Sequence, residues 1–315
     1  MVLFSMLAFL HNCLSHTPQR LGCGCRLPPP RRLLAGLLVG WLVIGWSWGA
    51  FTAADSARGA ELPPTLPSSE SALGRASIVV AGVPARQAAV IVERAEEVRR
   101  LACEFFHGDS SPAAWTEPCL VQVHTTTESF AAALGCEPPA AVRGATSLEF
   151  VGDRITLRRI DVIIAGADTI PDGLAHEIVH VVLADRFTAA PLPRWADEGL
   201  AVLFDDAPKQ AAHARDFEEA RRHRRALPVH ALLALEDYPP DTQGQEVFYG
   251  QSAALIRWLI AERGIERVMK CLEEAALSGS HEALARHFAL DSPEDFAPAW
   301  ITPAPIESLA ASQER

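Results

Sequence analysis

Two histidines four residues apart are the first feature of this chain that could carry chemistry. His176 and His180 bound the pentapeptide HEIVH, within the run LAHEIVHVVLADRF. On a helix, side chains four residues apart share a face with their Cβ atoms about 5–6 Å apart, so both imidazoles could reach one zinc ion. Glu177 follows the first histidine directly, and its carboxylate could take the proton of a water on that metal. The pattern therefore predicts a zinc site with a glutamate as general base.

An amphipathic core helix with two incidental histidines is the alternative interpretation. Its apolar stripe would consist of Leu174, Ile178, Val181 and Val182. Pro171 is tolerated in a first helical turn, and Asp168 or Thr169 could cap that turn. Because three fixed positions recur by chance in long chains, the motif needs support from its surroundings.

A third metal ligand is expected from the stretch PRWADEGLA, residues 193–201. Catalytic zinc usually takes three protein ligands and leaves a fourth position for water. Glu198 lies 18 residues after His180, beyond a turn that contains two prolines. This separation allows a second helix to fold back on the first and present a carboxylate to the same ion. Asp197 is an alternative ligand, and otherwise it is a solvated or capping carboxylate.

The two motifs together resemble those of the gluzincin metallopeptidases, and the wording WADEGLA resembles peptidase MA-like domain proteins. The resemblance implies that His176, His180 and Glu198 bind zinc and that Glu177 is the base. It implies an α+β, zincin-like fold, in which a small mixed sheet leads to the active-site helix and a mostly helical C-terminal part follows. It extends over about residues 77–300, and beyond the two motifs only the segment FYGQS is specific.

Two neighbouring zinc-peptidase patterns do not fit the chain. The metzincin pattern needs a glycine and a histidine at positions that hold Leu183 and Arg186. The thermolysin-like pattern has an acidic residue four positions after the ligand glutamate, where this chain has Val202. A carboxylate that orients a ligand histidine must therefore come from elsewhere, and Asp197 and Asp205 are the candidates.

Tyr249, within FYGQS, is a candidate for stabilising a reaction intermediate. The resemblance implies that a tyrosine downstream of the metal site donates a hydrogen bond to the oxyanion. His230 is a second candidate donor, and a packing role is the alternative for Tyr249. The remaining histidines of the exported part with no ligand spacing are predicted to be structural or exposed: His107, His124, His281 and His287.

The strands and helices that must position these residues can be read from the pattern of apolar residues. A helix is expected from Ala85 to Phe106, and a strand from Cys119 to His124. Residues 147–164 are expected to form two or three strands broken at Gly152-Asp153. By the resemblance, Ile155–Ile164 supplies the edge strand along which an extended peptide pairs, and an ordinary internal strand is the alternative. The chain after residue 205 is expected to be mostly helical.

The first 60 residues are predicted to lie outside the folded domain. Residues 33–54 contain no charged side chain, and a bilayer-spanning helix needs about 20 residues. Arginines precede this apolar run, so the N-terminus is expected in the cytoplasm and residues 61–315 outside it. The run is either a cleaved signal peptide or an uncleaved membrane anchor. A Pro/Ser-rich linker (61–75), a peptidase MA-like domain (76–302) and a tail (303–315) are expected to follow.

Net charge and cysteine content indicate which partners and which disulfides to expect. A net charge of −11 argues against a nucleic-acid partner, which would need clustered lysines and arginines. The exported part holds Cys103, Cys119, Cys136 and Cys271, an even number that permits two disulfides. Cys103 with Cys119 is the first pairing to expect, and buried thiols are the alternative.

The sequence thus predicts an exported or membrane-anchored zinc metallopeptidase whose substrate is a peptide or protein. One rival is a non-catalytic binding module that keeps the zinc fold. The intact Glu177 argues against it, because a purely structural site has no use for a base. A second rival is a metal-dependent hydrolase that acts on a non-peptide amide.

Overall fold

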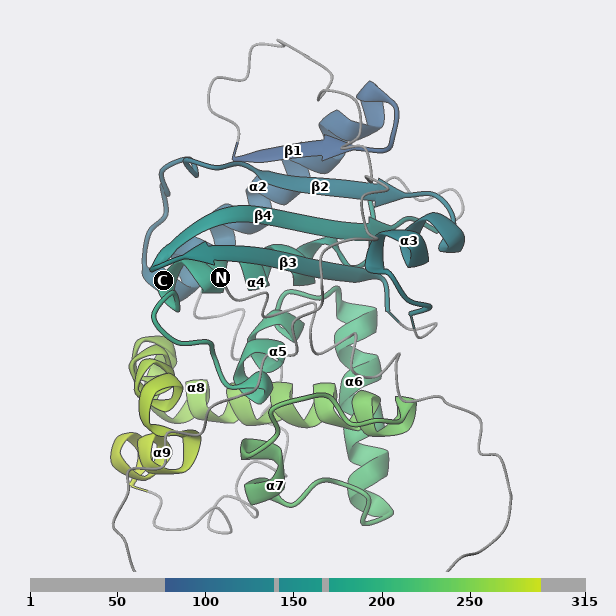
Figure 1. Cartoon of the computed structure of the whole chain (residues 1–315). Coiled ribbons are helices and arrows are strands. Elements are labelled where there is room, and N and C mark those ends of the chain that lie inside the picture. Colours follow the sequence, from purple (N-terminus) through teal and green to yellow (C-terminus); the bar gives the residue numbers. More distant parts are fainter. Residues whose placement is uncertain (1–76, 139–141, 166–169, 290–315) are drawn as a thin grey trace, which may run out of the picture. The chain divides into compact units, whose positions relative to one another are not determined.

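The computed structural model describes residues 77–138, 142–165 and 170–289. They form an α+β unit with a four-stranded mixed sheet and a mostly helical C-terminal part (Figure 1), which confirms that part of the predicted fold. The predicted apolar run 33–54, the linker 61–75 and the tail 303–315 lie outside the described residues. So do the predicted caps Asp168 and Thr169.

The sheet has the strand order β1-β2-β4-β3. Its strands are β1 (Ile78–Ala81), β2 (Cys119–His124), β3 (Gly144–Val151) and β4 (Arg154–Ile163). β1, β2 and β4 run parallel, whereas β3 and β4 form an antiparallel hairpin. The hairpin turns at Gly152, whose φ of 64° is readily adopted by glycine, and this confirms the predicted break.

The predicted edge position of Ile155–Ile164 is wrong, because β4 lies between β2 and β3. Ile160 and Val162 of this strand are fully buried, and β4 pairs with a neighbour along both sides. The strand at the open edge on this side is β3 instead. β3 also contacts α4, the helix that carries the two candidate ligand histidines.

Two helices, α2 (Ala85–His107) and α4 (Leu174–Arg186), lie behind the sheet in Figure 1 and pack against each other. The short helix α3 (Thr127–Leu134) contacts β2 and β4. α4 begins later than predicted, since Gly173 is its N-cap and Pro171 lies in the turn before it. The predicted apolar stripe of α4 is confirmed as buried: Leu174, Ile178, Val181 and Val182.

The C-terminal part consists of five helices among the described residues. They are α5 (Arg194–Val202), α6 (Ala207–Arg222), α7 (Val229–Leu233), α8 (Thr242–Ser278) and α9 (Ser280–Phe288). α8 is kinked at Gly264, which has a φ of 74°. α5 packs closely on α8 at Gly199, where an added Cβ would lie 2.7 Å from the carbonyl oxygen of Ser252. This close contact fixes the helix that carries Glu198.

Within the described residues, no helix combines the length and the apolarity that crossing a membrane requires. The predicted disulfide between Cys103 and Cys119 is not formed. These two cysteines and Cys271 are buried thiols, in agreement with the alternative interpretation. Burial raises the pKa of Cys103 to about 11 and that of Cys119 to about 12, so both stay protonated at neutral pH.

Candidate metal centre

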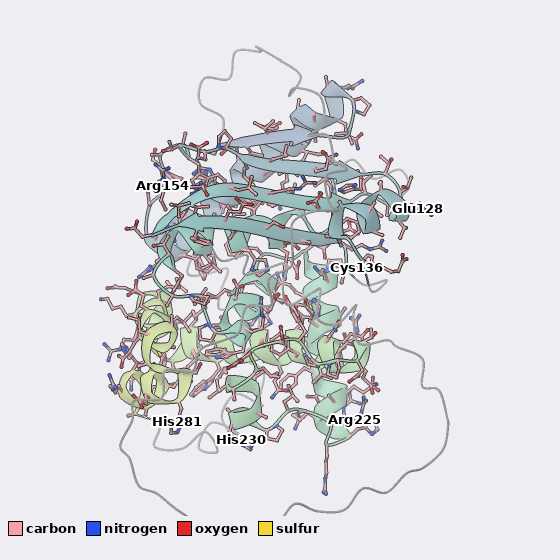
Figure 2. All side chains as sticks on the ribbon, in the orientation of Figure 1. Glu128, Cys136, Arg154, Arg225, His230 and His281 are labelled. Carbon is pink, nitrogen blue, oxygen red and sulfur yellow. The ribbon has the colours of Figure 1, made fainter. Side chains whose placement is uncertain are left out.

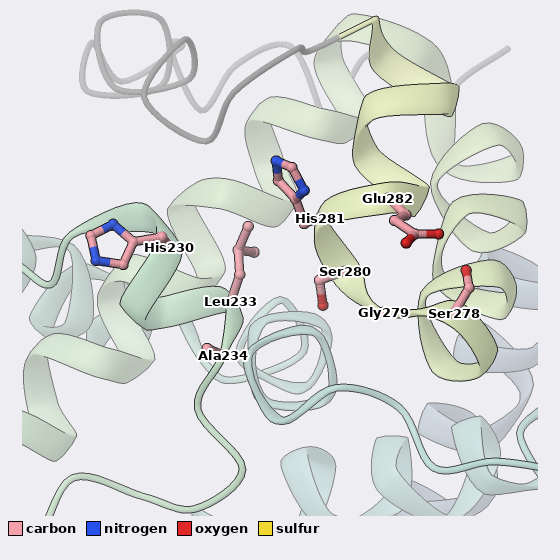
Figure 3. A pocket seen from close by; sticks show the side chains of 8 residues that line it. All are labelled: His230, Leu233, Ala234, Ser278, Gly279, Ser280, His281 and Glu282. Carbon is pink, nitrogen blue, oxygen red and sulfur yellow. The ribbon is translucent and has the colours of Figure 1, made fainter.

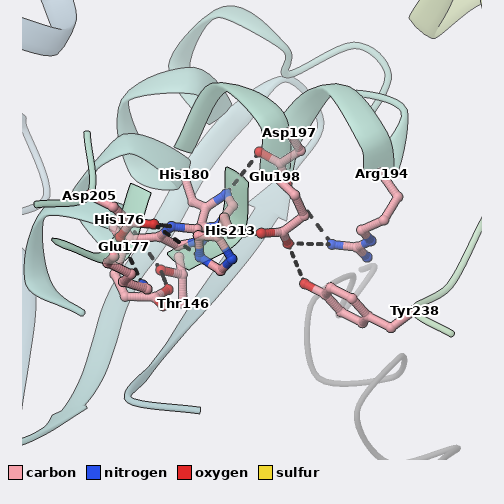
Figure 4. Close-up of polar contacts among 11 residues, drawn as sticks. Thr146, His176, Glu177, His180, Arg194, Asp197, Glu198, Asp205, His213 and Tyr238 are labelled. Carbon is pink, nitrogen blue, oxygen red and sulfur yellow. Dashed lines mark hydrogen bonds and ion pairs between the residues drawn. The ribbon is translucent and has the colours of Figure 1, made fainter. Parts of the chain in front are cut away.

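Three side chains from two helices converge to form the candidate metal centre (Figure 4). α4 supplies His176 and His180, and α5 supplies Glu198. One potential ligand atom from each residue lies within 4.8 Å of the other two. The Nε2 atoms of His176 and His180 lie 3.1 and 3.7 Å from Oε2 of Glu198. The three predicted ligands are thus brought together at one point.

Two aspartates hold the outer nitrogens of the histidines. His180 Nδ1 lies 2.9 Å from Asp197 Oδ1, and His176 Nδ1 lies 3.3 Å from Asp205 Oδ2. Both aspartates were candidates for this role in the sequence, and the structure places both there. Each contact orients its imidazole so that Nε2 points to the shared centre. Asp197 consequently belongs to the supporting contacts rather than to the ligand triad.

The candidate base Glu177 is held by the edge strand β3. Thr146 donates a hydrogen bond from Oγ1 to Oε2 of Glu177, at 2.7 Å. Gly144 leaves room for the same side chain, since a Cβ at residue 144 would lie 2.6 Å from Glu177 Cγ. Sequence reasoning missed both residues. They lie more than 30 positions before Glu177, and no local pattern links them to it.

Both tyrosines of the chain contribute to the centre. The predicted residue Tyr249 places its ring edge-on to that of His176, with centroids 6.2 Å apart. Tyr238, which sequence reasoning did not assign, donates a hydrogen bond from its hydroxyl to Oε1 of Glu198. Burial and then the charge of Glu198 hold the pKa of both phenols well above the usual value, so both stay protonated.

His230, the other candidate donor, lies elsewhere. It lines a pocket with residues of α7, α8 and α9, and none of the lining residues belongs to the triad (Figure 3). Figure 2 likewise shows His230 and His281 on the helical part at the end far from the sheet. The structure therefore does not bring His230 to the centre.

The charges of the triad stabilise one another. Burial lowers the pKa of His176, but contacts with Asp205 and Glu198 outweigh burial and raise the pKa to about 10. For His180, burial is likewise outweighed, chiefly by Asp197 and Glu198, and the pKa rises to about 9. Burial opposes ionisation of Glu198, but His180 and His176 hold its pKa well below the usual range. Without a metal, the two histidines therefore balance these carboxylates together with Lys209 and Arg194.

The donor set fits a divalent metal ion. It consists of two imidazole nitrogens and one carboxylate oxygen, which is a ligand set found in catalytic zinc sites. Structural zinc sites are closed by four protein ligands, usually with cysteine, whereas three ligands converge here among the described residues. Metal binding requires neutral imidazoles, so a bound ion would replace the two histidine protons as the balancing charge.

Comparison with known protein families and with curated proteins yields no match for this chain.

Proposed function

We propose that this chain is a zinc-dependent metallopeptidase of gluzincin type with a zincin-like fold. The observation that carries the proposal is the convergence of His176, His180 and Glu198 next to a glutamate held on the same helix as the histidines. Three ligands leave a position for water, and a base adjacent to that position is what amide hydrolysis requires.

His176, His180 and Glu198 would hold the zinc ion. When bound, zinc lowers the pKa of a coordinated water and polarises a substrate carbonyl. Glu177 accepts the proton of the attacking water and later passes it to the leaving amine. Because Thr146 already donates a hydrogen bond to Oε2 of Glu177, we assign this transfer to Oε1.

Tyr249 remains the proposed donor to the oxyanion, and its protonated phenol suits that role. Tyr238 is a second protonated phenol in contact with a ligand oxygen. The rings of the two tyrosines lie 6.1 Å apart, so both belong to one wall of the centre.

We further propose that the catalytic domain works outside the cytoplasm, either secreted or attached through residues 33–54. This part of the proposal rests on the uncharged run and the arginines that precede it. The substrate would then be a peptide or protein outside the cytoplasm.

The test is digestion of an unbiased peptide mixture by the zinc-loaded chain beside its Glu177→Gln variant. We expect zinc-dependent cuts by the wild type, and a loss of at least about 100-fold in the variant, because a general base contributes about that much. Removal of zinc by a chelator should abolish the cuts, and zinc should restore them.

A folded, zinc-loaded wild type that cuts no peptide would contradict the proposal. Hydrolysis of small non-peptide amides by the same protein would then favour the rival hydrolase. Retention of the cuts in the Glu177→Gln variant would remove Glu177 from its assigned role.

A further inference from the structure

Arg194 is a mostly buried cation beside the metal centre whose donors are poorly used. It begins α5, one helical turn before Glu198, and its side chain is only 18% exposed. The first turn of a helix is the electrostatically unfavourable end for a cation, so the charge does not serve the helix itself.

The contacts that Arg194 makes leave its guanidinium without close acceptors. Its Nη1 lies 3.9 Å from Oε1 of Glu198 and 3.9 Å from Oδ2 of Asp197, which is beyond hydrogen-bond distance. Its Nε is buried and has no hydrogen-bond partner within the described part of the chain. A buried donor without a partner is unusual in proteins and calls for an explanation.

The neighbouring carboxylates have other donors. Glu198 receives the hydroxyl of Tyr238 on Oε1, and Asp197 pairs with His180 through Oδ1. Arg194 is therefore not the principal partner of either. Its Cζ also lies 5.0 Å from the centroid of the Tyr238 ring, a cation–π contact that helps to hold the guanidinium in place (Figure 4).

A planar guanidinium whose N–H groups make no hydrogen bond with the described residues matches the two oxygens of a carboxylate. We propose that Arg194 binds a substrate carboxylate next to the scissile bond, either the free C-terminus of a peptide or an acidic side chain. The four acidic residues around the centre, Glu177, Asp197, Glu198 and Asp205, favour a singly charged group over a more highly charged phosphate. This inference names a substrate class for the proposed peptidase and rests on that function.

The experiment measures binding rather than turnover. The full chain with Glu177→Gln, loaded with zinc, is titrated calorimetrically with three matched N-acetylated tripeptides. The first has neutral side chains and a free C-terminal acid, the second is its C-terminal amide, and the third is an amide with one glutamate. We expect one of the two carboxylate peptides to bind at least about tenfold more tightly than the neutral amide, because charge-assisted hydrogen bonds are the stronger kind.

The two carboxylate peptides distinguish the two sources. A preference for the free acid identifies a C-terminal carboxylate, and a preference for the glutamate amide identifies an acidic side chain. In a Glu177→Gln, Arg194→Gln double variant the preference should disappear. Arg194→Lys should retain only part of it, because lysine keeps the charge but not the planar fork.

Equal binding of the three peptides, or binding of none of them, would overturn the inference, and neither outcome requires any Arg194 variant to fold. Survival of the preference in a folded, zinc-loaded Arg194→Gln variant would overturn it as well. A wild type that cuts peptides without regard to carboxylates would refute this inference alone. A carboxylate preference in binding without any cleavage would refute the peptidase alone.

Discussion

Two buried histidine–aspartate groups in this molecule share an aspartate contact but differ in the partner of the second ring nitrogen. In the sheet, His124 of β2 lies 2.8 Å from Asp161 of β4 through Nε2, and 3.3 Å from the hydroxyl of Ser129 through Nδ1. At the metal centre, His176 contacts Asp205 through Nδ1, but its Nε2 points to the ligand oxygen of Glu198.

The difference lies in the second nitrogen. His124 has both ring nitrogens engaged by residues of the sheet and of α3, so it has no nitrogen to offer a metal. His176 and His180 each engage one nitrogen with an aspartate and direct the other to a common point. Burial and an aspartate contact are thus common to both groups and do not separate them. Convergence of the remaining nitrogens is what distinguishes the candidate metal centre from the group in the sheet.

The largest effect is expected when one side chain is removed from each group. Glu198→Ala should lose nearly all bound zinc, because two ligands rarely hold the ion. His124→Ala should keep about one zinc per chain and lose only stability. Metal analysis after dialysis measures both. Full zinc retention by the Glu198 variant would remove this residue from the centre, and zinc loss by a folded His124 variant would erase the distinction.

The next largest effect concerns how zinc affinity at His176 and His180 depends on pH. The pKa values of His176 and His180 are raised to about 10 and about 9, so both are protonated in the metal-free protein at neutral pH. Zinc must displace both protons, so its affinity should rise by up to about 100-fold per pH unit between about pH 6 and 8. Calorimetry in buffers of different ionisation enthalpy counts the released protons. Uptake that releases none would mean that the imidazoles are already neutral.

A smaller effect is expected from the aspartates. Asp205→Asn and Asp197→Asn should each weaken zinc binding by about 10–100-fold, because the outer contacts orient the ligand histidines. Asp161→Asn is the matched control in the sheet, and it should leave zinc affinity unchanged. Competition with a chromophoric chelator reports the affinities. Equal effects at all three positions would indicate a general loss of stability instead of ligand positioning.

The smallest effect concerns the hydroxyl that holds the base. Thr146→Val should lower kcat by about tenfold with little change in KM, which corresponds to loss of one hydrogen bond to a charged group. Thr146→Ser should restore most of the rate. Ser129→Ala removes the comparable hydroxyl beside His124 and should leave the rate unchanged. Steady-state kinetics on one peptide compares the three variants, and identical rates for Val and Ser at residue 146 would contradict the assignment.

The sequence predicted the parts of the centre that depend on local spacing. The HEIVH helix follows from helical periodicity over a short stretch of chain. Glu198 was expected from the resemblance of WADEGLA to a known family, and Asp197 and Asp205 as the acidic residues that follow the histidines in the sequence. The same periodicity gave the buried stripe of α4 and the mostly helical C-terminal part. These features hold because residues close in the sequence remain close on a helix.

The parts that the sequence did not predict depend on contacts between distant segments. β4 was expected at the sheet edge, but its parallel pairing with β2 and the hairpin with β3 place it inside. Thr146 reaches Glu177, and Tyr238 reaches Glu198 across 40 positions, only because the fold brings β3 and the loop before α8 to the centre. Neither residue carries a local signal, since an isolated threonine or tyrosine is equally suited to packing.

The missing side chain of Gly144 has a consequence for how such proteins are recognised. One extra methyl group at this position would occupy the space of the Glu177 side chain and force it to move. A related gene with alanine at position 144 would retain the HEIVH and WADEGLA motifs unchanged and keep its three candidate metal ligands. Under the proposed function, such a gene would nevertheless encode an inactive protein, because its base would be displaced. Residue 144, which belongs to neither motif, would then separate working catalysts from inactive descendants in any survey of related genomes.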